Sequence, residues 1–283
     1  MSPSCINYLH FLGFFLLGIV LPTFALNTDG VLLLSFKYSI LRDPLSVLET
    51  WNYEDKTPCL WKGVTCTELG LPGTPDMFRV TSLVLPDSQL LGSIPPDVGY
   101  IEHLRHLDLS NNFLNGSLPN SFDNATELQV ISLSNNEISG ELPGSIGALK
   151  SLQLLNLSDN ALAGKVPGYL TALQNLTVLS LRTNYFSGYV PSGFNSVEVL
   201  DLSSNLLNGS LPLNFGGDNL QSQSLYLCSA KKQILLEEIW IFVENPCQIF
   251  AQYLQPSLLH QIFQLLHLLL QSYPNHWSQV PHS

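Results

Sequence analysis

Leucine and isoleucine side chains recur through the middle of the chain at a fixed spacing. From residue 104 to residue 191 the unit Leu-x-x-(Leu/Ile)-x-Leu-x-x-Asn occurs four times with a period of 24 residues, and each Asn is followed by a Gly and a Pro. A period of this length is typical of solenoids, in which each repeat is one supersecondary unit. The two apolar residues of Leu-x-Leu point to the same side of a short strand, so we expect stacked parallel strands with leucines inside.

Asparagine, glycine and proline keep the same positions in all four repeats. They are, in order, Asn112, Gly116 and Pro119; Asn136, Gly140 and Pro143; Asn160, Gly164 and Pro167; and Asn184, Gly188 and Pro191. A variant repeat with Ser88 in the asparagine position precedes them, and a repeat with Asn205 follows three residues early. We expect each Asn amide to hydrogen-bond its own and the neighbouring coil. The Gly then permits a tight turn, and the Pro fixes φ on the return leg.

These residues resemble the ectodomains of plant leucine-rich-repeat receptor-like kinases and receptor-like proteins. The Leu-x-Gly-x-(Ile/Leu)-Pro segment is specific to the plant type, and residues 29–37, 51–52 and 58–66 look like the N-terminal cap of that family. The resemblance runs from about residue 27 to about residue 219. It implies an α/β repeat solenoid, a curved superhelix with a parallel β-sheet and an N-terminal helical cap.

The cap is expected to cover the first repeat, because an open solenoid end exposes apolar surface. We expect a helix with Val31, Leu34 and Ile40 on its buried side. The resemblance implies that Trp51 and Trp61 join this cover, and that Cys59 and Cys66 close a small loop by a disulfide.

The N-terminus has the features of a signal peptide. Residues 9–21 are apolar except for His10, and the small residues Thr23 and Ala25 precede an expected cleavage after residue 25. No Lys or Arg stands before the apolar segment, so a membrane-anchoring or buried helix is the alternative. We expect secretion, which places the mature chain in an oxidising compartment.

The repeat pattern stops after Asn219. The residues that follow are rich in Gln and Leu and lack the asparagine pattern. We can choose permitted codons for these residues and start each triplet one nucleotide earlier. In that shifted frame, the stretch that encodes residues 231–273 can encode a segment that resembles the ectodomain ending and juxtamembrane stalk of the family. We interpret the tail as the product of a frame change, with a divergent but genuine tail as the alternative. The expected domains are 1–25 (signal peptide), 26–79 (cap), 80–219 (about six repeats) and 220–283 (an aberrant tail without fixed structure).

Charge and motifs exclude several functions. The chain carries 11 basic and 22 acidic residues, a net charge of −11, which disfavours nucleic acid and anionic membrane surfaces as partners. No P-loop, kinase or zinc motif is present, and residues 258–270 are too short an apolar run to span a membrane. His106, Asp108 and Ser110 share one strand face, but neighbours there lie about 7 Å apart, too far for a catalytic triad. We expect no enzyme activity, cofactor or metal.

The exposed strand face is the expected binding surface, because its side chains are free of the core. We expect this face to be polar, mildly acidic and poor in aromatic residues. The candidate binding residues are His106, Asp108, Ser132, Asn156, Asp159, Ser180, Arg182 and Asp201.

Five Asn-x-(Ser/Thr) sequons suit a secreted glycoprotein, and we expect glycans at some of them. They are Asn115, Asn124, Asn156, Asn175 and Asn208. A glycan on Asn156 would obstruct partners on the strand face.

The resemblance implies the truncated ectodomain of a receptor-like kinase at the cell surface. Such a module recognises a peptide or protein ligand or another receptor ectodomain. Two alternatives remain: a secreted inhibitor of cell-wall-degrading enzymes, which has the same fold, and a truncated product without function.

Overall fold

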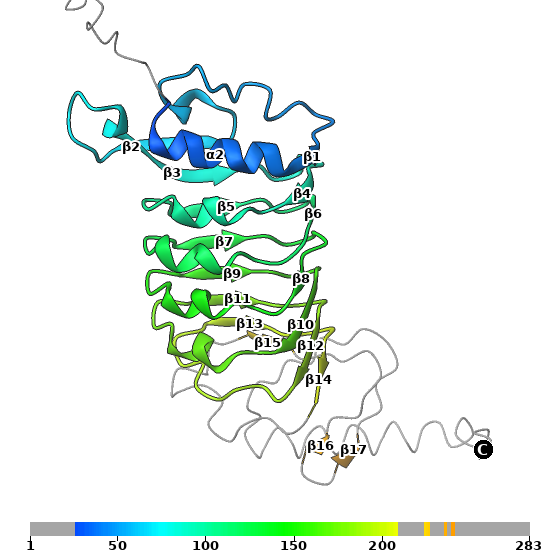
Figure 1. Cartoon of the computed structure of the whole chain (residues 1–283). Helices are drawn as coiled ribbons and strands as arrows, with labels where there is room; N and C mark the ends of the chain where they lie inside the picture. Colours follow the sequence, from blue (N-terminus) through cyan, green and yellow to red (C-terminus); the bar gives the residue numbers. More distant parts are fainter. Residues whose placement is uncertain (1–25, 209–223, 227–234, 237–238, 241–283) are drawn as a thin grey trace, which may run out of the picture.

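The described part of the chain forms a curved stack of coils that is covered by a helix at its N-terminal end. A computed structural model describes residues 26–208 and three short strands at 224–226, 235–236 and 239–240. Helix α2 (Thr28–Ser39) lies across the first coil, and the coils follow one another along the stack (Figure 1). The predicted leucine-rich-repeat solenoid is therefore confirmed. The expected signal peptide and most of the tail lie outside the described residues.

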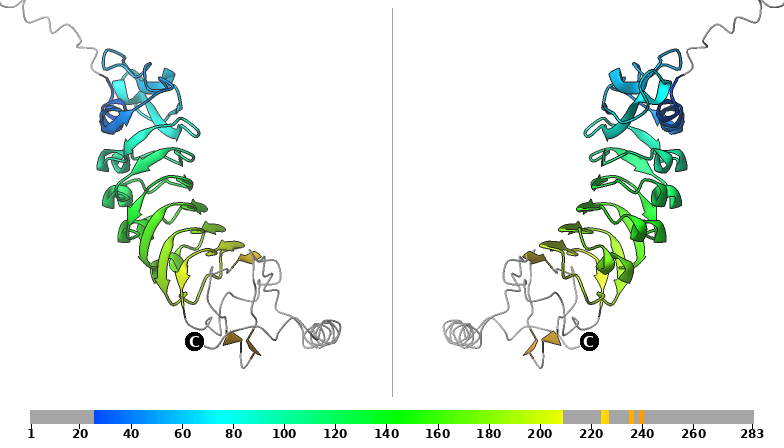
Figure 2. Two further views of the ribbon diagram at one scale, coloured as in Figure 1. Left: turned by 90° about the vertical axis from the view of Figure 1, so that its right-hand side faces the viewer. Right: turned by 90° about the vertical axis from the view of Figure 1, so that its left-hand side faces the viewer.

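One sheet runs the length of the stack, on the inner side of its curvature (Figure 2). Its strands are, in spatial order, β15 (Ser224–Tyr226), β13 (Val199–Asp201), β11 (Val178–Ser180), β9 (Leu154–Asn156), β7 (Val130–Ser132), β5 (His106–Asp108), β3 (Phe78–Val84) and β2 (Val64–Glu68). All neighbours are parallel except β2 and β3. The central residues Leu107, Ile131, Leu155 and Leu179 are paired in register and fully buried.

Short 3₁₀ helices form the outer side of the stack. They are η3 (Pro96–Tyr100), η4 (Asn120–Asn124), η5 (Gly144–Ala148) and η6 (Gly168–Ala172). Each follows a proline in extended conformation, and each buries an apolar side chain under the sheet, as Phe122 does in η4. The proline of the repeat therefore sets the start of the outer helix.

The asparagine ladder forms as the spacing predicts. Asn184 Nδ2 donates to Leu157 O of the preceding coil (2.9 Å) and to Leu181 O and Arg182 O of its own coil (both 3.1 Å). Asn184 Oδ1 accepts from Leu162 N (2.9 Å). The same pattern occurs at Asn112, Asn136, Asn160 and Asn205. In the variant repeat, the Ser88 hydroxyl donates only to Pro86 O, within its own coil.

A second set of strands follows the asparagines on one lateral side of the stack. They are β4 (Leu91–Ser93), β6 (Phe113–Asn115), β8 (Ser139–Gly140), β10 (Ala161–Lys165), β12 (Tyr185–Gly188) and β14 (Leu206–Leu207). The repeat glycines Gly116, Gly140, Gly164 and Gly188 turn the chain here with φ between 78° and 87°, a region that disfavours other residues. Strand β1 (Ile40–Arg42) of the cap adds antiparallel to β4.

The cap differs from the sequence prediction in the face that its helix buries. Leu33, Leu34 and Phe36 are buried, whereas Val31 is 56% exposed and Ile40 lies just past the helix end, partly buried. Val31 was predicted on the wrong side. At about 100° per residue, the buried arc that contains Leu33 and Phe36 leaves Val31 outside it.

The remainder of the cap is held by aromatic and ionic contacts. Trp51 and Trp61 are buried and stack with ring centroids 5.1 Å apart, and a disulfide joins Cys59 to Cys66. Asp29, fully buried in α2, accepts from Arg79 Nη2 (2.9 Å) and from Val80 N (2.7 Å) in β3. The hydrogen bonds that Arg79 donates to the Asp29 carboxylate raise the pKa of Arg79. Two further 3₁₀ helices, η1 (Pro58–Leu60) and η2 (Pro75–Met77), complete the cap.

Far from the cap in the sequence, β16 (Leu235–Leu236) pairs antiparallel with β17 (Ile239–Trp240).

Removal of one ladder amide should destabilise the whole stack. Asn184→Ala leaves a buried N–H and three backbone carbonyls without this partner, so we expect the free energy of unfolding to fall by about 2–4 kcal/mol. Chemical denaturation measures the change, and the exposed Gln174→Ala serves as the control with an expected change within about 0.5 kcal/mol. Equal stabilities of the two variants would contradict the role of the ladder.

Candidate functional site

The inner face of the sheet carries a polar column along its strands. Asp108, Ser132, Asn156, Ser180 and Asp201 occupy the same register position on β5, β7, β9, β11 and β13. All five are partly exposed and lie between buried core residues of their strands. Because neighbouring strands lie about 4.8 Å apart, the five side chains form a continuous strip.

An apolar column lies directly beside the polar one, and the sequence analysis missed it. Two residues earlier on each strand stand Val130, Leu154, Val178 and Val199, which are also in register. They are partly exposed, Val199 to 37%, and His106 precedes them on β5. The prediction of a polar face was therefore incomplete. The sequence contains a signal for this column. In these four repeats, the residue directly before the Leu-x-Leu or Ile-x-Leu of the strand is aliphatic.

On three coils, a serine lies two residues after the polar column and is hydrogen-bonded to it. Ser110 is only 7% exposed, because its hydroxyl donates to Asp108 Oδ1 at 2.7 Å and its amide donates to the same oxygen at 3.0 Å. Ser158 is bound in the same way by Asn156, and Ser203 by Asp201. These contacts hold the side chains of the polar column in place. The Ser110 hydroxyl is thus already a donor to Asp108.

The two remaining candidate residues lie at the edge of the face. Arg182 is exposed and lies two residues after the polar column on its coil, where the other repeats have serine. Asp159 is exposed in the turn after β9 with φ of 54°, and its backbone N–H donates to Arg182 O at 2.8 Å. The structure thus brings five of the eight candidates into one column and leaves His106, Asp159 and Arg182 around it.

A charged cluster stands just before β5, at the other edge of the sheet. Glu127 accepts from Arg105 Nε at 2.9 Å and contacts His103 Nδ1 at 2.7 Å, which ties two successive coils together. Burial raises the pKa of the Glu127 carboxyl, but the hydrogen bonds with His103 and Arg105 outweigh burial and lower the pKa below the ordinary value of 4.5.

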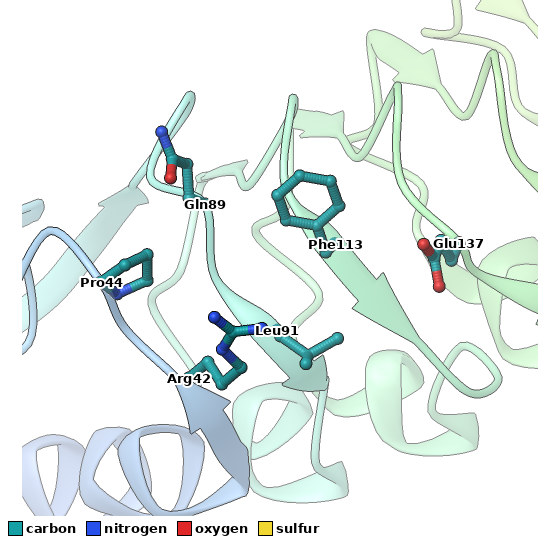
Figure 3. A pocket seen from close by; sticks show the side chains of 6 residues that line it. All are labelled: Arg42, Pro44, Gln89, Leu91, Phe113 and Glu137. Atoms are coloured by element: carbon teal, nitrogen blue, oxygen red, sulfur yellow. The ribbon is translucent and has the colours of Figure 1, made fainter.

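The lateral side offers a shallow hollow where the cap meets the second set of strands (Figure 3). Its volume is about 330 Å³. It is lined by Arg42, Pro44, Gln89, Leu91, Phe113 and Glu137. Within the part of the chain that the structure describes, no cluster of His, Cys, Asp or Glu could hold a metal ion. No helix among these residues is both long and apolar enough to cross a bilayer.

The five sequons lie on different sides of the stack. Asn156 stands in the polar column on β9, and Asn115 and Asn208 belong to the lateral strands or directly follow them. Asn124 ends η4 on the outer side, and Asn175 lies in the turn between η6 and β11. Only Asn156 would place a glycan on the inner face.

Family models match most of the described chain. The leucine rich repeat N-terminal domain matches residues 26–67, and leucine rich repeat models match residues 78–138, 102–162, 175–197 and 196–217. The matched regions thus contain the cap and the repeats, and no kinase domain.

Curated and solved proteins show the same similarity. A receptor protein kinase-like protein of Arabidopsis thaliana is 82% identical over 201 residues, which are 71% of this chain and 27% of that protein. The leucine-rich-repeat ectodomain of the Arabidopsis membrane receptor kinase GASSHO1/SCHENGEN3, solved with CASPARIAN STRIP INTEGRITY FACTOR 2, matches with a TM-score of 0.64 and 32% identity over 71% of this chain and 23% of that one. The Arabidopsis receptor kinase HAESA, solved with the peptide hormone IDA and the co-receptor SERK1, matches with a TM-score of 0.62 and 30% identity over 72% and 33%. This chain therefore spans about a quarter of the length of its curated relative.

The charged cluster predicts a pH dependence of stability. Because the pKa of Glu127 is lowered in the folded state, its charge stabilises the fold above its ordinary pKa, and this contribution disappears as the pH falls through the folded pKa. Glu127→Gln should therefore lower the melting temperature at pH 6–7, and this effect should shrink as the pH falls below 4.5, the ordinary value of that pKa. The measurement is the melting temperature of both proteins between pH 3 and 7. A difference that stays constant over this range would exclude the ionised contact.

Proposed function

The chain belongs to the plant leucine-rich-repeat receptor-like kinases through its N-terminal domain and repeats, and from this premise we propose that it binds a peptide or protein ligand outside the cell. The observation that carries the proposal is the pair of columns on the inner face. Five polar and four aliphatic side chains lie in register there, outside the core. A row of aliphatic side chains beside a row of polar ones offers an extended ligand both apolar and polar contacts.

The columns suit an extended segment that runs along the stack. From Asp108 to Asp201 the polar column crosses four strand spacings, about 19 Å, which an extended peptide of about six residues spans. Apolar side chains of the ligand would pack on Leu154 and Val178, and its polar groups would face Asn156 and Ser180. The carboxylates at the two ends of the column favour a ligand with basic residues.

The solved relatives support this class of ligand. GASSHO1/SCHENGEN3 was solved with CASPARIAN STRIP INTEGRITY FACTOR 2, and HAESA with a peptide hormone and a co-receptor. By analogy, a second receptor ectodomain is a further partner of this chain. The proposal places the chain in the secretory pathway and at the cell surface. It also requires that Asn156 carries no glycan, because a glycan there would cover both columns.

Two alternatives follow from the same fold. One is a secreted inhibitor of cell-wall-degrading enzymes, and the other is a truncated product without function. The receptor interpretation is preferred because the relative at 82% identity is a receptor kinase-like protein. The candidate binding residues Asp108, Ser132, Asn156, Ser180 and Asp201 form the core of the proposed site, with His106, Asp159 and Arg182 at its margin.

Charge placed in the apolar column should abolish binding without unfolding the chain. We expect the double variant Leu154→Asp, Val178→Asp of the secreted chain to lose at least about tenfold in affinity for a peptide selected from a synthetic library of secreted plant peptides. Asp123→Ala, in η4 on the outer side, is the matched control and should bind as the wild type does. Circular dichroism verifies that each variant is folded, and biolayer interferometry measures affinity.

Two outcomes would contradict the proposal. One is a library from which no peptide binds the folded wild-type chain. The other is a peptide whose affinity is unchanged by the double variant, because its site would then lie elsewhere.

A further inference from the structure

Phe113 and Asn115 share the open face of lateral strand β6. Along this strand Phe113 is 50% exposed, Leu114 is fully buried and Asn115 is partly exposed, as the alternation of a strand requires. Residues two apart on one face are separated by about 7 Å. Phe113 makes no ring contact among the described aromatic residues, so half of a large apolar surface remains in solvent without a protein partner.

Asn115 is the acceptor of a sequon, and it is placed for modification. Gly116 turns the chain after the strand with φ of 78°, and Ser117, the third residue of the sequon, is exposed. Within the described part of the chain, the Asn115 side chain makes no hydrogen bond. By contrast, Asn124 Nδ2 donates to Ser121 O at 2.8 Å and Asn175 Nδ2 donates to Lys150 O at 2.7 Å. A sugar on Asn115 therefore displaces no side-chain hydrogen bond among the described residues.

We propose that Asn115 carries an N-linked glycan and that its first N-acetylglucosamine packs on the ring of Phe113. The sugar attached to Nδ2 reaches back along the strand face over the ring two residues earlier. One face of the sugar presents C–H groups, which the electron-rich face of an aromatic ring attracts, and the contact removes apolar area from water. This inference rests on secretion, which the proposed function also requires.

The surroundings of Phe113 complete a sugar-sized site. Leu91 on β4 is paired in register with Phe113 and extends the apolar floor, while Arg42, Gln89 and Glu137 supply hydrogen-bonding groups at the rim of the hollow (Figure 3). An apolar platform with a polar rim matches a sugar, which has hydroxyl and amide groups around an apolar face. A first sugar that packs on Phe113 would thus lie against the hollow between the cap and the second lateral strand.

The other sequons lack this arrangement. Asn124 also follows a phenylalanine by two residues, but Phe122 is fully buried and offers no surface to a sugar. Leu173, two residues before Asn175, is buried as well. Asn156 and Asn208 follow leucines, which have no aromatic face. Asn124 is therefore a matched control, since it has the same sequence spacing with the ring out of reach.

The glycan on Asn115 has a consequence for partners. It covers the lateral side beside the cap and leaves the columns of the inner face open. A binding partner is thereby directed to the inner face.

A double-mutant cycle on the secreted full-length chain, expressed in plant cells, tests the contact. Glycopeptide mass spectrometry first measures occupancy of Asn115. Melting temperatures are then compared for the wild type and Ser117→Ala, which removes the glycan but keeps Asn115, each with and without Phe113→Ala. We expect the glycosylated chain to melt about 2–4 °C above Ser117→Ala when Phe113 is present. In the Phe113→Ala background, we expect this difference to be less than about 1 °C. Phe113→Tyr should retain the gain, because the ring is kept.

The control uses Thr126→Ala, which removes the sequon of Asn124. Any effect of that glycan should be the same with and without Phe113→Ala. The inference is overturned if Asn115 is unmodified in a secreted chain, or if the glycan stabilises equally in both Phe113 backgrounds. Either result leaves the proposed function intact when the same chain still binds its peptide, so the two failures are distinguishable.

Discussion

The hydrogen bonds of the ladder asparagines set the geometry on which the rest of the molecule depends. A coil of 24 residues must turn out of the sheet after each short strand, and the turn leaves backbone groups without strand partners. Each ladder amide satisfies such groups in two successive coils at once, as Asn160 does with Leu133 O and Leu157 O. Because each amide bonds its own coil and the preceding one together, the ladder fixes the distance and the register of one coil on the next.

The binding face follows from this register. Once Leu107, Ile131, Leu155 and Leu179 are stacked inside, the residues directly before and after each of them on the strands must form columns outside. A polar and an aliphatic column then run side by side. Successive members of each column come from different repeats and are far apart in the sequence. The same constraint produces the lateral strands, where Phe113 and Asn115 share one face. Both surfaces are therefore consequences of the core, and their chemistry is set by residues that the core does not use.

Much of this arrangement is predictable from single residues and their spacing. The period of 24 predicts the sheet, the buried leucines, the asparagine ladder and the turns at the glycines. Besides the apolar column, three features escaped prediction for physical reasons. Val31 is exposed because the buried arc of α2 is set by its contact with the first coil, which a helix sequence alone does not specify. Ser110 is buried because it bonds Asp108, a local contact that strand alternation ignores. The pairing of Asp29 with Arg79 joins residues 50 positions apart, which no repeat pattern contains.

Hydrogen exchange of the amides that the ladder holds tests the account most directly. The N–H groups of Leu114, Ile138 and Leu162 donate to Asn136, Asn160 and Asn184, and the three donor residues lie in or directly before the lateral strands. If the ladder ties the coils together, these three amides open only with the strands, at the same free energy as the amides of β7, β9 and β11. If they exchange as fast as amides in the exposed turns while the strands stay protected, the ladder is a local contact and does not set the register of the stack.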